Sequence, residues 1–302
     1  MDDPPGEPTE NGRPRFESSD VIGDQISTQE WEPQPSTGSL TWHGFPDTPM
    51  PQVGAVWGDP PGDLEEGVVQ YCSGTVVSRA LVLTAAHCLY SQRDGQFYGD
   101  ISFVPGQTWN NTQSTDPLDI SAPAGVWAAS QWWVPEGYRD GTVDLDWGLI
   151  EIEPQNGRYI GDAVGAFAIQ TGITFREGAH IWAAGYPRSG WWATPEGRLG
   201  RGQYSCDTTW DGSWKTHENG EGVELWIRCP MNGGASGGPW FVALNSGQWV
   251  VGGVNNWCND DFKDDDESPE AYCTPVSEDL RSLAVDSRFL EFWNSVQPLL
   301  TL

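Results

Sequence analysis

The sequence predicts an all-β protein, and two observations lead to this prediction. The chain of 302 residues contains 37 Gly and 23 Pro, which divide it into many short segments. Between these breaks lie short runs rich in β-branched and aromatic residues, which is the pattern of strands. We expect strands at residues 52–57, 68–71, 74–78, 80–84, 101–104, 125–129, 148–152, 181–184, 223–227, 240–244 and 249–254. Many short strands at this spacing are typical of barrels or a sandwich.

The two ends of the chain differ from this pattern. Residues 1–48 hold Pro, Gly, acidic and hydroxyl residues without a clear period, so we expect an extended N-terminal arm or pro-segment with no core. At the other end, apolar residues recur near a period of 3.6, which predicts a helix whose last turn is weakened by Pro298. Its apolar residues are Phe289, Leu290, Phe292, Trp293, Val296 and Leu299.

The charge balance excludes some classes of partner. Lys and Arg number 15 against 43 Asp and Glu, which gives this acidic protein a net charge of -28. Such a surface repels a phosphate backbone and an anionic membrane, so nucleic acid is not an expected partner. No apolar run of about 18 residues or more occurs, so no membrane-spanning helix is predicted. We expect a monomer.

Six cysteines indicate disulfides rather than a zinc site. They lie at positions 72, 88, 206, 229, 258 and 273, and no Cys-x-x-Cys pair is among them. Many connectivities are possible. The simplest joins sequence neighbours, Cys72 with Cys88, Cys206 with Cys229, and Cys258 with Cys273. Disulfides persist in oxidising compartments, so we expect a secreted, extracellular protein, although the chain opens without a signal peptide.

Two segments carry the residues of a serine nucleophile and its base. Ser236 lies within Gly234-Ala235-Ser236-Gly237-Gly238-Pro239, and His87 lies within Thr84-Ala85-Ala86-His87-Cys88 at the end of an apolar run. A hydroxyl attacks at neutral pH only when an imidazole takes its proton and amides hold the oxyanion. Glycines beside Ser236 let the backbone turn so that its amides point at the reacting carbonyl. The pairing predicts a peptidase, against the alternatives of a structural histidine and a flexible glycine turn.

The acidic partner of the histidine is less certain from the residues alone. Asp140, Asp144 and Asp146 all lie close together in the sequence, and any of them could reach an imidazole. We favour Asp146, because it immediately precedes an apolar strand where a carboxylate would be buried and oriented. The remaining histidines, His43, His180 and His217, are predicted to be surface or core residues.

Several motifs, in order, resemble the chymotrypsin-like (trypsin-like) serine peptidases, and more narrowly the bacterial secreted branch related to glutamyl endopeptidases. They are Cys72-Ser73-Gly74-Thr75-Val76-Val77 with Leu83-Thr84-Ala85-Ala86-His87-Cys88, then Asp146-Trp147-Gly148-Leu149-Ile150, Gly185-Tyr186-Pro187, and the segment from Gly234 to Pro239. The resemblance covers about residues 50 to 285.

The resemblance implies two six-stranded antiparallel β-barrels with an active site between them. Residues 49–160 would form the first barrel, with His87 and Asp146, and residues 161–302 the second, with Ser236 and the C-terminal helix. His87 would be the general base and acid, Asp146 would orient it, and Ser236 would attack. The amides of Gly234 and Ser236 would form the oxyanion hole. The residues implied in substrate binding are Pro230, Met231, Asn232, Gly233, Asn255, Asn256 and Trp257.

Three departures from the family pattern bear on activation and specificity. Ala235 replaces the Asp that binds a freed N-terminal amine in the animal enzymes, so the ordinary zymogen switch is not expected, and the arm would act by another route, such as covering the cleft. In the segment before Ser236, no Asp stands at the position that gives trypsin its preference for Lys and Arg. Asn255 stands where many glutamyl endopeptidases have His. Neither a strict basic nor a strict Glu preference is therefore predicted, and Pro230 with Met231 would admit apolar or mid-sized side chains.

An acidic run lies between Cys258 and Cys273, from Asp260 to Glu267. A solvated loop explains it most simply, and the functional alternatives are a structural calcium site or a rim that attracts cationic substrates. Taken together, these features predict a secreted serine endopeptidase that acts on proteins or peptides through a Ser-His-Asp triad and an acyl-enzyme, without a cofactor or catalytic metal. The alternative is a catalytically silent relative that uses the double barrel to bind protein or glycan.

Overall fold

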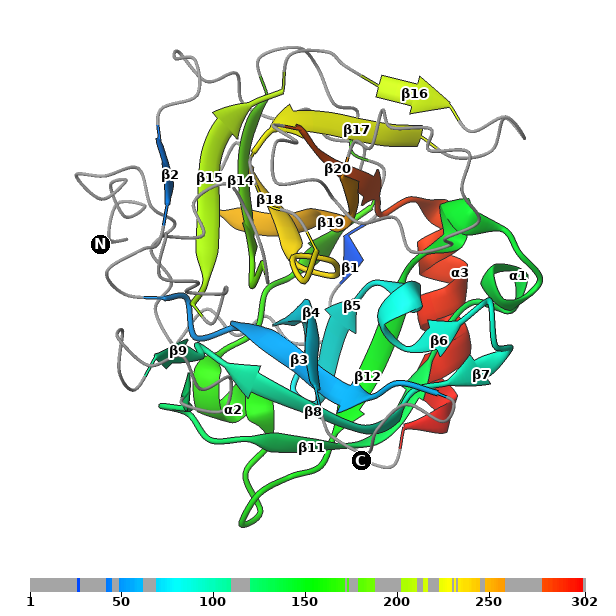
Figure 1. Cartoon of the computed structure of the whole chain (residues 1–302). Coiled ribbons are helices and arrows are strands. Elements are labelled where there is room, and N and C mark those ends of the chain that lie inside the picture. Colours follow the sequence, from blue (N-terminus) through cyan, green and yellow to red (C-terminus); the bar gives the residue numbers. More distant parts are fainter. Residues whose placement is uncertain are drawn as a thin grey trace, which may run out of the picture.

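The first half of the chain closes into a six-stranded barrel. The computed structural model describes residues 26–27, 42–44, 49–61, 69–109, 120–171, 173, 179–187, 202–210, 214–216, 223–229, 231, 233–244, 248–258 and 279–300. The barrel runs in the order β11-β12-β5-β4-β3-β8 (Figure 1). Its strands are β3 (Val53–Asp59), β4 (Val69–Val76), β5 (Leu81–Thr84), β8 (Gly99–Pro105), β11 (Trp127–Trp133) and β12 (Gly148–Ile152).

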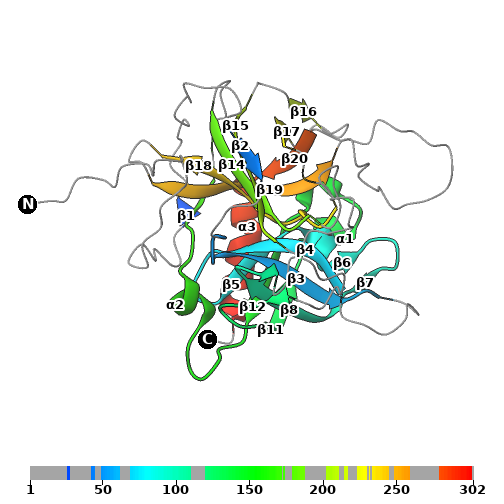
Figure 2. The ribbon, with the colours of Figure 1, turned by 60° about the vertical axis from the view of Figure 1, so that its left-hand side comes forward.

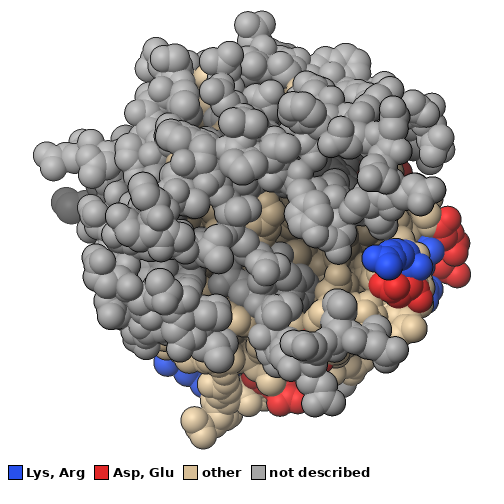
Figure 3. All heavy atoms as spheres, viewed as in Figure 1, with Lys and Arg blue, Asp and Glu red and all other residues tan. Residues whose placement is uncertain are grey.

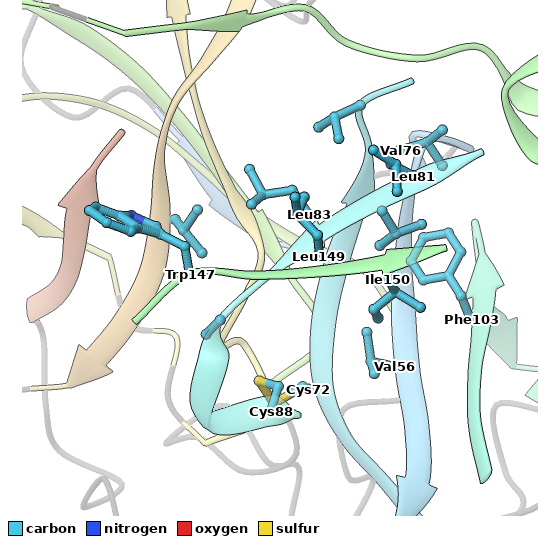
Figure 4. Packing of buried hydrophobic residues seen from close by; sticks show 14 of the residues in the cluster. Val56, Cys72, Val76, Leu81, Leu83, Cys88, Phe103, Trp147, Leu149 and Ile150 are labelled. Atoms are coloured by element: carbon cyan, nitrogen blue, oxygen red, sulfur yellow. A yellow bond between two sulfur atoms is a disulfide. The ribbon is translucent and has the colours of Figure 1, made fainter. Parts of the chain in front are cut away.

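Apolar runs explain why the adjacent barrel strands β5 and β12 are buried on both faces. Every residue of both strands is buried, including the alternate positions that would face solvent in a half-exposed strand. The strands pair antiparallel, with Leu83 opposite Leu149 and Val82 opposite Ile150. In Figure 4, Leu83 and Leu149 lie together on one side of β12, and Ile150 lies on the other side, towards Phe103. Because both faces of β5 and β12 are covered, the segments that leave their ends are firmly placed.

The second half of the chain contributes most of a ten-stranded sheet. Its main path is β16-β17-β20-β19-β18-β14-β15-β2, and β13 links β19 to β1. The strands are β13 (Ile169–Gln170), β14 (His180–Gly185), β15 (Tyr204–Thr209), β16 (Trp214–Thr216), β17 (Val223–Arg228), β18 (Pro239–Ala243), β19 (Trp249–Cys258) and β20 (Asp279–Ala284). A separate group of buried side chains, including Trp240, Ile181 and Met231, packs against this sheet.

Two short strands of the N-terminal arm join this second sheet. Strand β1 (Ile26–Ser27) pairs parallel with β13, and β2 (Trp42–Gly44) pairs antiparallel with β15. The sheet is therefore larger than the six strands expected. The expected arm thus contributes five strand residues, because strand partners far along the chain supply the hydrogen bonds that the local sequence does not specify.

The C-terminal helix crosses back to the first barrel. Helix α3 (Ser287–Val296) begins at Asp286, whose carboxylate accepts hydrogen bonds from the N–H groups of Arg288 and Phe289, and a 3-10 turn, η3 (Gln297–Leu299), follows at Pro298 as expected. The buried face of α3 belongs to the core of the first barrel, and the Phe289 ring meets Trp147 edge-on at 5.8 Å between centroids. Figures 1 and 2 both show α3, in red, alongside the first barrel. From the sequence, this helix was assigned to the second barrel. In the structure, its apolar face packs into the core of the first barrel.

Short elements connect the strands. They are β6 (Tyr90–Ser91), β7 (Gln96–Phe97), β9 (Thr108–Trp109), β10 (Ile120–Ser121), α1 (Glu136–Arg139), α2 (Ile160–Val164), and the 3-10 turns η1 (Ala86–Cys88) and η2 (Val143–Leu145). The turn η1 follows β5 and the turn η2 precedes β12, and both lie at the end where Thr84 pairs with Gly148. None of the helices in the described part of the chain has the length and apolar character that a membrane crossing requires.

Candidate active site

His87 stands on a short turn that is fixed on both sides. Strand β5 ends at Thr84, whose hydroxyl donates to the carbonyl of Ser73 at 2.7 Å. The turn η1 then carries His87, and a disulfide joins the next residue, Cys88, to Cys72 on β4, with the two Cα atoms 6.0 Å apart. This confirms the first predicted disulfide. The His87 side chain is 29% exposed, so its ring is held firmly and still reaches the surface.

Asp146 holds the imidazole of His87 in one orientation. Its Oδ2 lies 2.6 Å from Nδ1 of His87, and its Oδ1 accepts a hydrogen bond from the backbone N–H of the same residue at 2.7 Å. The carboxylate is completely buried. A buried anion beside Nδ1 favours the tautomer with its proton on Nδ1, which makes Nε2 the ring nitrogen that accepts a proton.

The two competing carboxylates have other positions. Asp144 is buried and bonds to Arg288 of α3, with Oδ2 2.7 Å from Nη1. Asp140 is exposed at the end of α1. Among these three residues, the contact to the imidazole is thus made by Asp146.

The pairing with Asp146 makes the protonated form of the His87 imidazole more favourable than it is for a free imidazole in water. Burial lowers the pKa of His87, but the charge of Asp146 and its hydrogen bond raise it, and the net pKa lies above the usual 6.5. Burial and the charge of Asp146 also raise the pKa of the nearby Tyr138, so its phenol stays neutral. The region around His87 therefore stabilises a positive charge on the imidazole and opposes a further negative one.

Ser236 lies on a tight turn between β17 and β18. Gly234 and Gly237 have φ angles of 97° and 82°, which is the left-handed region that only glycine adopts without strain. At Gly237 a Cβ atom would collide with Thr84 Oγ1, with the carbonyl O of Ser73 and with the N of Ala85. The backbone therefore requires glycine at positions 234 and 237, and the segment is not a loose linker.

Ser73 connects this turn to the first barrel. Its N–H donates to the carbonyl of Ser236 at 2.7 Å, and its hydroxyl donates to the carbonyl of Gly234 at 2.8 Å. The same hydroxyl accepts from the N–H of Tyr186 at 2.7 Å. The sequence motifs contain Ser73, but nothing in its local pattern showed that it would join the two halves of the site.

The turn of Ser236 and the ring of His87 lie against the same disulfide. The Sγ of Cys88 is 3.8 Å from the carbonyl O of Ser236. A ring nitrogen of His87 and the sulfurs of Cys72 and Cys88 all lie within 4.8 Å of one another. Because the two sulfurs are bonded to each other, this group is not a set of metal ligands. The structure thus brings the three predicted residues His87, Asp146 and Ser236 into one region.

The backbone N–H groups of Gly234 and Ser236 are available for an incoming group. Within the described residues neither N–H donates to a protein acceptor, while the carbonyls of both residues are bound by Ser73. Ser236 is partly exposed. Backbone amides next to a nucleophile can stabilise an oxyanion, which is the role that the sequence predicts for these two.

Asn255 on β19 supports the Ser236 turn from within the second sheet. Its Nδ2 donates to the carbonyls of Ala184 and Ala235, each at 2.9 Å, and its Oδ1 accepts from Trp240 Nε1 at 2.7 Å. Its backbone exchanges hydrogen bonds with Gly237 and Gly238. The side chain is 0% exposed. Asn255 was predicted to contact substrate; the structure instead places its side chain behind the turn.

The other predicted pocket residues fall in three groups. Met231 is fully buried in the second core, so its side chain packs inside the sheet and does not line an open pocket. Gly233 is partly exposed, and Asn256 is 4% exposed with no hydrogen-bond partner for Nδ2 or Oδ1. Pro230, Asn232 and the side chain of Trp257 lie outside the described residues.

The second predicted disulfide is also confirmed. Cys206 on β15 bonds to Cys229 after β17, with the Cα atoms 5.8 Å apart. The third pair, Cys258 with Cys273, and the acidic run from Asp260 to Glu267 lie outside the described residues. In the face shown in Figure 3, the charged side chains of the described part that can be seen lie at the right and along the lower edge.

The sequence matches the family model of the trypsin-like peptidase domain over residues 72–252, which is more than half of the chain. The chain belongs to this family. A related glutamyl endopeptidase of Bacillus licheniformis is 29% identical to this trypsin-like peptidase over 176 residues, which cover 58% of the chain and 46% of the relative. The chain therefore spans about half the length of the curated relative it matches.

Solved structures agree on the fold of this trypsin-like peptidase. Protease Anisep from Arthrobacter nicotinovorans superimposes with a TM-score of 0.60 at 23% identity, covering 82% of this chain and 96% of its own. A Glu endopeptidase in complex with MPD gives a TM-score of 0.58 at 18% identity, covering 87% and 98%. The predicted all-β, chymotrypsin-like fold is confirmed.

Proposed function

We propose that this trypsin-like peptidase is a serine endopeptidase with Ser236 as nucleophile, His87 as general base and acid, and Asp146 as the residue that orients His87. The observation that carries the proposal is the two-point contact of Asp146 with the backbone N–H and the Nδ1 of His87. This contact keeps the proton on Nδ1 and presents Nε2 as the base. The proposal adds one contact, from the Ser236 hydroxyl to Nε2.

The reaction follows from these positions. Ser236 Oγ attacks the carbonyl carbon of the peptide bond, and its proton passes to Nε2 of His87. The amides of Gly234 and Ser236 stabilise the oxyanion until the C–N bond breaks, when His87 returns the proton to the leaving amine. A water molecule then attacks the acyl-enzyme with the same base, which releases the acid and restores the hydroxyl of Ser236.

The substrates we propose are proteins or peptides outside the cell. Two disulfides indicate an oxidising compartment. The relative named a glutamyl endopeptidase suggests acidic side chains at the cleaved bond, but Asn255 stands where His is expected and its side chain faces the Ser236 turn. We therefore propose that Asn255 does not select the substrate side chain directly.

Hydrolysis of a mixed peptide library by the full chain and by Ser236→Ala tests the proposal. The native chain should cleave with a defined preference, and Ser236→Ala, with the same thermal unfolding midpoint, should lose nearly all of this activity. If both proteins bind peptides or glycans equally and neither cleaves, the chain is the silent binding relative and the proposal is wrong.

A further inference from the structure

Arg288 connects the C-terminal helix to the segment that carries Asp146. It lies in the first turn of α3, and its Nη1 donates to Oδ2 of Asp144 at 2.7 Å. Its Nε and Nη2 donate to Oδ2 of Asp286, the residue at the N-terminus of the same helix, at 3.0 and 2.7 Å. One guanidinium thus binds two carboxylates, Asp144 and Asp286, that lie 142 residues apart in the sequence.

The same side chain also lies over the residue that follows Asp146. The Cζ of Arg288 is 5.6 Å from the centroid of the Trp147 ring, within the range of a cation–π contact. Trp147 is fully buried and also packs edge-on against Phe289. In Figure 4, Trp147 lies apart from Leu149 and Ile150, away from the barrel residues of β12.

These contacts enclose Asp146 between two anchored neighbours. Asp144 is in the three-residue turn η2, Asp146 directly follows that turn, and Trp147 comes next. The side chain of Asp144 is 3% exposed and that of Arg288 is 25% exposed, so the pair is partly shielded from water and salt. A partly buried charge-assisted hydrogen bond of this kind fixes geometry more tightly than an exposed pair does.

We propose that Arg288 is a positioning residue for catalysis, which holds the backbone on both sides of Asp146 so that its carboxylate meets His87. This inference rests on the proposed function. It makes the start of α3 a part of the catalytic machinery, although the helix does not contact the reacting atoms. Arg288 acts through Asp144 and Trp147, because a small displacement of Asp146 would disturb both of its hydrogen bonds to His87.

The test compares Arg288→Met and Arg288→Lys with a matched control, Arg79→Met. Arg79 makes a similar pair of contacts on the same barrel, with its Nε 3.0 Å from Asp162 and its Cζ 4.0 Å from the ring centroid of Tyr159, but it is more exposed and not attached to Asp146. Arg288→Met should lower kcat by about 10- to 100-fold with little change in KM, because misplaced groups cost this much. The kcat of Arg288→Lys should lie between those of Arg288→Met and the native chain, and the kcat of Arg79→Met should stay within about twofold of the native value.

A double variant separates positioning from the cost of an orphaned charge. Arg288→Met leaves Asp144 buried and unpaired, which by itself destabilises the fold. Adding Asp144→Asn removes that charge without restoring the anchor. The double variant should regain thermal stability while its kcat stays within about twofold of Arg288→Met. Recovery of kcat together with stability would show that Arg288 only neutralises Asp144, and the inference would be wrong.

Two further readouts report the His87–Asp146 contact itself. The charge and hydrogen bond of Asp146 raise the pKa of His87, so a displaced Asp146 should move the acid limb of kcat/KM to lower pH. Of the groups around Asp146, Tyr138 stays neutral because its pKa is raised, and Arg288 stays charged because, despite burial, its pKa is raised by Asp286 and Asp144. The low-field Nδ1–H resonance of His87 should shift in Arg288→Met and remain in Arg79→Met. If Arg288→Met does not fold, Arg288→Lys and Asp144→Asn provide the same comparisons.

The inference and the proposed function fail in different ways. A native chain that does not react with a serine-directed phosphonate contradicts the proposed function. A native chain that reacts, with an Arg288→Met variant whose kcat, acid limb and Nδ1–H resonance are unchanged, contradicts only the role of Arg288.

Discussion

Replacing Asp146 by Asn is expected to abolish most of the activity by placing the proton of His87 on the wrong nitrogen. The carboxylate now accepts from two donors, the backbone N–H and the Nδ1–H of His87, at 2.7 and 2.6 Å. An amide has only one oxygen. The backbone N–H is a fixed donor and will claim that oxygen, so the NH₂ group will face Nδ1 and require it to accept. The proton of the ring then moves to Nε2, the atom that must act as base.

The size of the effect follows from the change in these two contacts, because the bond to the backbone loses its charge and the bond to Nδ1 reverses. A hydrogen bond to a charged group contributes about 1.5–3 kcal/mol, so the two together set an upper bound of about 3–6 kcal/mol. The same substitution in a Ser-His-Asp triad lowers kcat by about 10⁴, which corresponds to about 5.4 kcal/mol of transition-state stabilisation. The two values agree, so we expect a loss of kcat of about four orders of magnitude with KM changed by little.

Steady-state kinetics on one peptide substrate, with the active sites counted by a phosphonate, measure this loss. Asp140→Asn is the matched control, since Asp140 is an exposed carboxylate in the same segment, and it should keep the native kcat. Circular dichroism and thermal unfolding should show that both variants are folded. A folded Asp146→Asn variant with kcat within about tenfold of the native chain would refute the orienting role of Asp146, because that loss is only about 1.4 kcal/mol.

Three further outcomes are expected. Gly237→Ala should destabilise the fold by at least about 1–3 kcal/mol and remove activity, because a φ of 82° is strained for Ala and the added Cβ would collide with Thr84. Denaturant unfolding measures the loss of stability, and kcat measures the loss of activity. Asn255→Leu should lower the free energy of unfolding by several kcal/mol, because two carbonyls and the Trp240 indole lose their hydrogen-bond partner. Asn256→Leu should raise it by about 1 kcal/mol, because the amide of Asn256 is buried and unpaired. A gain in stability with a changed peptide-library preference would assign Asn256 to substrate recognition, and a loss of stability would contradict its unpaired state. The rate kcat/KM should fall with decreasing pH through a midpoint above 6.5, because the base must be neutral and the pKa of His87 is raised; a midpoint below 6.5 would contradict the contact with Asp146.

The strands with continuous apolar runs were predictable from the sequence. The prediction of residues 148–152 matches β12, and the runs at 80–84 and 101–104 lie in β5 and β8. These segments need only burial and β-branched packing, which a local pattern records. The helix at the C-terminus was likewise predictable from its period, and the weakened last turn expected at Pro298 is a 3-10 turn in the structure.

Other elements depend on partners that no local pattern reveals. Strand β15 (Tyr204–Thr209) is rich in Ser, Asp and Thr, yet nearly all of it is buried, because β14 and β2 pair with it on both sides and His180 bonds to Asp207. The position of α3 against the first barrel and the pairing of Arg288 with Asp144 also arise from contacts across the whole chain. For the same reason, Ser73 and Asn255 could be located in motifs from the sequence, but their support of the Ser236 turn could not.

Mapping the adduct of a fluorophosphonate tests the central claim most directly. The account predicts one adduct for each native chain, located on Ser236 by tandem mass spectrometry. It should be absent in Ser236→Ala and in the unfolded chain, and its formation should slow strongly in His87→Ala. An adduct at another residue, or labelling of Ser236 at the same rate with and without the imidazole of His87, would contradict the claim that the fold brings these two side chains together to make the hydroxyl reactive.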